Sequence, residues 1–176
     1  MNDLEFRPAA GEDLPTLVRL RDAAARWMNS LGTTGQWQPG ELGEDHFRRI
    51  MEDGEVWVAE IHGRAVGAWE LWWADPDAWG PQPPTAGYVH RLMVDHTRVP
   101  PGTGRRLLRA AERRVAGAGR VLTRLDCRAG NDRLTAYHLD PDQGRGAVTE
   151  GPVPDLRPWR AGLASAGPSS AQGLHT

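Results

Sequence analysis

Two glycines open an arginine-rich helical segment that follows a strand-like run and a short loop. The chain reads Gly102, Thr103 and Gly104, followed by Arg105 and Arg106. Amide hydrogens at a helix N-terminus point away from the helix, and the helix dipole adds about half a positive charge there. Glycine also lets a phosphate approach the backbone closely. The pattern therefore favours a phosphate site, although an ordinary turn at a helix start has the same residue types.

Two prolines precede this turn and remove backbone donors from it. Pro100 and Pro101 have no amide hydrogen, so the amides of residues 102–105 remain for an anion. Their fixed φ angles stiffen the loop and offset part of the loss. We expect weakened phosphate binding, not its absence. A dinucleotide-binding fingerprint is disfavoured, because Leu107 stands where its third glycine belongs.

Polar residues also lie on the strand predicted over residues 86–94. Alternation places Tyr88, His90 and Leu92 on one face and Val89, Arg91 and Met93 on the other. A histidine with a pKa near 6.5 suits a general base, so His90 is a catalytic candidate; a hydrogen-bonded core histidine is the alternative. Glu70, on the preceding predicted strand, is a weaker candidate base.

Eight tryptophans are many for a chain of 176 residues. Trp37 and Trp79 lie in segments rich in Gly and Pro, away from periodic core positions. An aromatic face in such a loop suits a pocket for a cation. Together with Glu70 and Tyr88 they are the candidate substrate-binding residues.

Hydrophobic periodicity predicts the elements that must position these groups. We expect helices over residues 11–31, 44–53, 102–119 and 131–139, and strands over residues 4–9, 55–61, 65–74, 86–94 and 121–127. Residues 75–84 hold four prolines and are predicted to be a loop. This order predicts a mixed α/β (α+β) fold around one sheet.

The pattern fades towards the C-terminus. We predict one domain over residues 1–150, with at most a short strand near residues 147–150, and a Gly/Pro/Ser-rich tail over residues 151–176 that is disordered or an edge segment. Prolines interrupt the region where a last strand would lie.

Composition excludes several classes of protein. No apolar run is long enough for a membrane span, no secretory signal is evident, and the single cysteine excludes a disulfide and a cysteine-based zinc site. Residues 1–97 hold 16 acidic residues against 8 arginines, which would repel a nucleic acid and suits a cationic acceptor. We expect a cytoplasmic protein, a monomer or homodimer, with no metal site.

From Leu4 to about His138 the chain resembles the GNAT superfamily of acetyl-coenzyme A-dependent N-acetyltransferases. Three segments carry the likeness, in the family's order: GYVHRLMVD, GTGRRLLRAAERRVAGAG and LTRLDCRAGNDRLTAYH. The family's phosphate loop reads Q/R-x-x-G-x-G/A; both glycines match, Val99 replaces the leading residue, and Arg98 lies one place early. The resemblance implies a mostly antiparallel sheet of six or so strands flanked by about four helices.

The resemblance also implies a cofactor, acetyl-CoA, and residues that hold it. The amides of Gly102, Thr103, Gly104 and Arg105 would bind its diphosphate. The main chain of Leu92, Met93 and Val94 would run beside its pantetheine arm, and Asn131 matches an asparagine that hydrogen-bonds the cofactor.

Catalytic residues follow from the same likeness. The place of the family's acid, commonly a tyrosine, holds His138, with Tyr137 just before it, and Asp126 falls where some members carry a base glutamate. An amine with a pKa of about 10.4 must lose a proton before it attacks a thioester, which costs roughly 4 to 5 kcal/mol at pH 7. A general base lowers that cost.

The expected function is transfer of an acetyl group from acetyl-CoA to a primary amine of a small molecule or of a peptide N-terminus. The alternative is a catalytically weak or inactive relative that binds an acyl-CoA or an aromatic small molecule. The prolines, His138 and the interrupted C-terminal end favour that alternative.

Overall fold

A single mixed sheet organises the molecule. The computed structural model describes residues 4–32, 37–127, 146–148 and 159–164. Within them the strands are β1 (Leu4–Pro8), β2 (Glu55–Ile61), β3 (Arg64–Trp72), β4 (Ala86–Val94), β5 (Leu122–Cys127), β6 (Gly146–Val148) and β7 (Trp159–Ala164). Their order in the sheet is β1-β2-β3-β4-β5-β7-β6, and only the β4–β5 pair is parallel among these described strands. The mostly antiparallel mixed sheet predicted above is confirmed, with seven described strands instead of about six.

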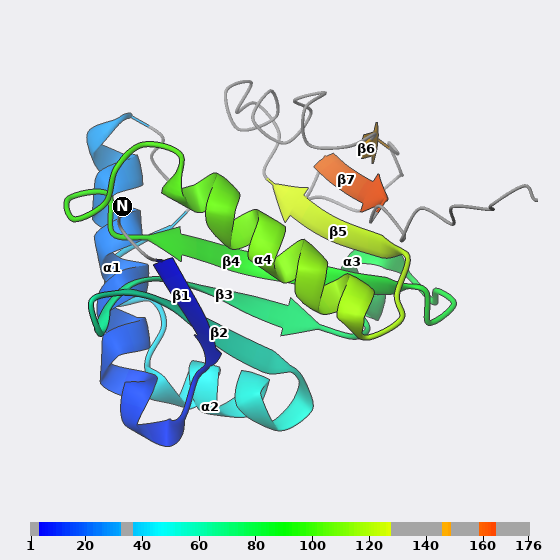
Figure 1. The fold of residues 1–176 in the computed structure, drawn as a ribbon, viewed down its shortest axis with the longest axis horizontal. Helices are drawn as coiled ribbons and strands as arrows, with labels where there is room; N and C mark the ends of the chain where they lie inside the picture. The colour runs from blue at the N-terminus through cyan, green and yellow to red at the C-terminus, as the bar shows by residue number, and fades with distance from the viewer. Residues whose placement is uncertain (1–3, 33–36, 128–145, 149–158, 165–176) are drawn as a thin grey trace, which may run out of the picture.

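Helices cover both faces of this sheet (Figure 1). They are a 3-10 turn (Gly11–Asp13), α1 (Leu14–Ser30), α2 (Glu44–Asp53), α3 (Pro76–Trp79) and α4 (Thr103–Gly117). Helix α4 packs against one face with a core that includes Trp69, Val89 and Leu107. Helices α1 and α2 cover the opposite face through Leu17, Phe47 and their neighbours. The sheet therefore has an α4 face and an α1–α2 face.

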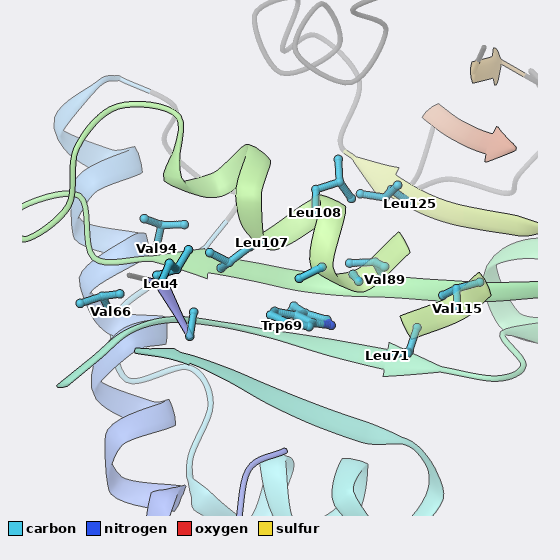
Figure 2. Packing of buried hydrophobic residues seen from close by; sticks show 13 residues of the cluster. Leu4, Val66, Trp69, Leu71, Val89, Val94, Leu107, Leu108, Val115 and Leu125 are labelled. Atoms are coloured by element: carbon cyan, nitrogen blue, oxygen red, sulfur yellow. The ribbon is translucent and has the colours of Figure 1, made fainter. Parts of the chain in front are cut away.

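Two strand glycines let α4 lie close to the sheet. A Cβ atom on Gly87 would lie 2.5 Å from Val115 Cγ2, and one on Gly67 would lie 2.8 Å from Leu107 Cδ2. Figure 2 shows Leu107 and Val115 pointing from α4 onto the strands at these levels. A side chain at either position would push α4 away from the sheet. These two glycines therefore set how closely α4 approaches the strands.

A β-bulge interrupts β4 at Arg91 and Leu92. The register with β3 shifts between Ala68, which pairs with Met93, and Glu70, which pairs with His90. Arg91 has a φ of 45°, which is unusual for a residue other than glycine. The extra residue reverses the alternation. Leu92 consequently packs towards α4 and Met93 towards α1, so the predicted faces of Leu92, Arg91 and Met93 were wrong.

Two other segments differ from the prediction. Residues 76–79 of the predicted proline-rich loop form the short helix α3, because Pro76 occupies its first turn and Asp75 Oδ1 accepts a hydrogen bond from the Ala78 amide. The predicted tail contributes β7, which pairs along its whole length with β5. None of the described helices is long and apolar enough to cross a membrane.

Candidate functional site

The turn before α4 has the geometry of an anion site. Gly102 is exposed and left-handed with a φ of 86°, which reserves the position for glycine. Within the described residues no acceptor bonds the amides of Gly102, Thr103 or Gly104. The Thr103 hydroxyl instead donates to the Pro100 carbonyl over 2.8 Å, which closes the turn from behind. The amides of residues 102–104 thus have no acceptor in this part of the chain, and their phosphate-binding role stays a prediction; Arg105 follows them half-buried.

Asp95 holds the loop that leads into this turn. Its carboxylate accepts a 2.6 Å hydrogen bond from the Thr97 hydroxyl and lies 3.2 Å from Arg98 Nε and 3.3 Å from Arg19 Nη1. Arg98 stands one place from the family's leading Gln/Arg, and here its side chain is engaged by Asp95. The amides of Thr97 and Arg98 also bond Asp95, so this loop is built around an internal carboxylate.

Strands β4 and β5 part beside the turn. Their pairing ends at Val89 and Leu125, whereas β4 continues to Val94 and β5 continues in register with β7. Because the bulge at Arg91 turns β4 away from its neighbour, the β4 edge over residues 90–94 has no strand partner on the β5 side within the described chain. The predicted cofactor-binding main chain of Leu92, Met93 and Val94 lies along this edge.

His90, on the same stretch of β4, contacts a buried carboxylate. His90 Nε2 lies 3.1 Å from Asp75 Oδ2, and the two side chains are only 9% and 3% exposed. The two atoms form an ion pair when the ring is protonated, although they are not aligned as a hydrogen bond. The Trp72 ring packs on the imidazole with centroids 4.3 Å apart. Asp75 and Trp72 thus fix the ring of the candidate base.

Glu70 lies opposite His90 in the β3–β4 register and is fully buried. Its two carboxylate oxygens bind His46 Nε2 at 2.7 Å and Arg91 Nη1 at 2.9 Å. Burial by itself would raise the pKa of Glu70, but the His46 hydrogen bond and the charges of Arg91, His46 and His90 outweigh it and lower the pKa. Glu70 is therefore ionised and committed to protein partners, which favours a structural and electrostatic role over that of a base.

The Trp37 ring packs against a cation of the protein itself. The guanidinium carbon of Arg21 lies 4.1 Å from the centre of the Trp37 ring. Trp79 and Tyr88 form a separate buried cluster beside α3, with Arg124 over both rings. A substrate role for Trp37, Trp79 and Tyr88 stays a prediction.

Several predicted site residues cannot be placed. Asn131, Tyr137 and His138 lie outside the described residues, and for Asp126 the structure describes the backbone, which pairs with Arg160. Their predicted roles stay predictions.

Sequence reasoning missed three residues of this region. Asp75 was predicted to lie in a loop, and neither His46 nor Arg21 was singled out. Arg21 is only 2% exposed. The only available signal was the spacing of Arg21 from Leu17 and Ala24, which puts it on the buried stripe of the helix.

Comparisons with known proteins agree with this architecture. The model of the acetyltransferase (GNAT) family matches residues 20–140. The fold is similar to that of a PaiA N-acetyltransferase from Thermoplasma acidophilum, solved with coenzyme A, with a TM-score of 0.71, 17% identity, and coverage of 92% of this chain and 99% of that one. A GNAT acetyltransferase from Listeria monocytogenes gives a TM-score of 0.72 and 21% identity over 91% of this chain and 95% of that one.

A third similar structure is YncA, a putative acetyltransferase from Salmonella typhimurium solved with acetyl-CoA. Its TM-score is 0.61 at 16% identity, and the match covers 99% of this chain and 96% of that one. No curated protein matches the sequence. Since the family model spans more than half of the chain, the chain belongs to the GNAT family of acetyltransferases, whose members use acetyl-CoA.

Proposed function

We propose that the protein is an acetyl-CoA-dependent N-acetyltransferase that acetylates a primary amine of a small molecule or of a peptide N-terminus. The observation that carries the proposal is the set of unbonded amides at Gly102, Thr103 and Gly104 beside the edge of β4 that β5 leaves open. These amides fit a diphosphate, and the open edge of residues 90–94 fits an extended arm that adds to the sheet like a strand. The acetyl group would pass from the bound thioester to the amine, and coenzyme A would leave as the free thiol.

His90 is the general base in this proposal. Its ring lies on the strand that would bind the cofactor arm, next to the carboxylate of Asp75, and would take a proton from the amine. The negative charges of Asp75 and Glu70 stabilise the imidazolium that results. This arrangement supplies part of the roughly 4 to 5 kcal/mol needed to present an alkylamine in neutral form at pH 7.

The remaining assignments rest on the family. Asn131 would hydrogen-bond the cofactor, His138 or Tyr137 would protonate the departing thiolate, and Asp126 is the competing candidate for the base. The cytoplasmic location and the monomeric or homodimeric state are parts of the same proposal.

Release of free thiol from acetyl-CoA with a panel of amines tests the function. Amine-dependent thiol release that is lost in His90→Gln supports it, with coenzyme A affinity as the control for the folded site. Tight coenzyme A binding without turnover on any amine would favour the alternative, a non-catalytic binder. The absence of an amide hydrogen at Pro100 and Pro101 favours that alternative.

A further inference from the structure

Arg21 carries unsatisfied donors in the interior of the protein. Its side chain is 2% exposed, and Nη2 donates to Glu41 Oε2 over 2.7 Å. Among the residues that the structure describes, Nε and Nη1 have no acceptor. Burial lowers the pKa of Arg21, and the nearby charge of Arg91 lowers it further, against the opposing effect of Glu41. A buried guanidinium with open donors is costly, and such a group calls for an explanation.

A second guanidinium faces the same region. The left-handed backbone of Arg91 at the β4 bulge turns its side chain to the α1–α2 face, where Nη1 binds Glu70. Arg91 remains 29% exposed along its side chain, so it is reachable from solvent. Backbone strain of this kind persists only where the surroundings enforce it, and it is concentrated at functional sites.

The carboxylates present do not complete this pair. Glu70 is held by both Arg91 and His46, and Glu41, which is the carboxylate on Arg21, is half-exposed on the segment that follows α1. Trp37, from that same segment, covers the Arg21 guanidinium. Because the open donors are buried, an anionic oxygen would have to enter beneath the Trp37 ring, where it would satisfy them while Glu70 keeps its partners.

We propose that the amine acceptor carries a carboxylate, and that Arg21 and Arg91 bind it under Trp37. The inference rests on the proposed function and names its substrate class: an amino acid with a free carboxylate. His90 and Arg91 are adjacent on β4. A small molecule is therefore long enough to place its amine at His90 and its carboxylate at Arg91. Each guanidinium already donates a hydrogen bond to a carboxylate oxygen, Arg21 to Glu41 and Arg91 to Glu70.

Matched acceptors test the proposal. Free amino acids and their carboxamides differ in the carboxylate alone, and kcat/KM should be at least about tenfold higher for the acids, as expected for one charge-assisted contact. In Arg21→Gln the ratio of kcat/KM for acids to that for carboxamides should fall to about one. Arg26→Gln, which removes an exposed charge from the same helix, should keep the preference. Arg91→Gln serves as the second variant, because its amide can still bond Glu70.

Binding without turnover keeps this inference separable from the proposed function. The indole signal of Trp37, followed by NMR with coenzyme A present, should shift on titration of amino acids and not of carboxamides. If that shift occurs and depends on Arg21 while no amine is acetylated, the carboxylate site stands and the transferase proposal fails. Equal response to acids and carboxamides, or an undiminished preference in both Arg21→Gln and Arg91→Gln, would overturn the inference.

Discussion

Replacement of Asp75 by asparagine separates the electrostatic role of this residue from its structural one. Asparagine caps a helix as well as aspartate does, so the hydrogen bond to the Ala78 amide and helix α3 should survive. What Asp75→Asn removes is the negative charge 3.1 Å from His90 Nε2. An opposite charge at this range stabilises a protonated histidine, by an amount on the order of 1 to 3 kcal/mol for a charge-assisted contact.

The rate of thiol release should therefore fall by about tenfold or more in Asp75→Asn, because the imidazolium that forms when His90 takes the proton loses this stabilisation. Coenzyme A affinity should stay unchanged, which separates the loss of the charge from a loss of the folded site.

The matched control is Asp77→Asn, which removes the same charge from an exposed site on the same helix. An unchanged rate of thiol release in Asp75→Asn, or an equal fall in Asp77→Asn, would refute the assignment of Asp75 as the residue that positions the base.

Three further predictions concern stability and affinity. Gly87→Ala should lower the free energy of unfolding in urea by about 1 to 3 kcal/mol, because its Cβ would meet Val115 at 2.5 Å, whereas Gly117→Ala meets nothing and should not. Asp13→Asn should lower it by about 1 to 2 kcal/mol at pH 7. The Arg7 hydrogen bonds outweigh burial and lower the pKa of Asp13, so the loss should vanish as the pH falls below that pKa; a loss that persists in acid would contradict this reading. Pro101→Ala restores an amide and should tighten coenzyme A binding by up to about tenfold; unchanged affinity would mean that this amide does not reach the diphosphate.

The main helices follow from local patterns. The run of Leu14, Leu17, Leu20 and Ala24 predicted a helix over residues 11–31, and α1 spans Leu14–Ser30. The second helix was predicted over residues 44–53 and is found at those bounds. In these segments the apolar period and the flanking turn residues agree with each other, and no distant contact is needed to decide the structure.

The site was less predictable because it depends on contacts between distant residues. Nothing near Arg91 in the sequence announces a bulge, since its left-handed backbone is imposed by the pairing with β3 and by the bond to Glu70. The role of Asp75 appears only when α3 folds back against β4 and sets its carboxylate on His90. The glycines of the α4 turn were visible from the sequence because the conformation they allow is local.

The account depends most on the diphosphate lying on the amides that open α4. Calorimetric titration with coenzyme A tests this directly: the native protein should bind, Gly104→Glu should abolish binding by placing a carboxylate at the phosphate position, and Gly117→Glu, at the far end of the same helix, should retain it. No binding by the native protein, or undiminished affinity in Gly104→Glu, would contradict the account.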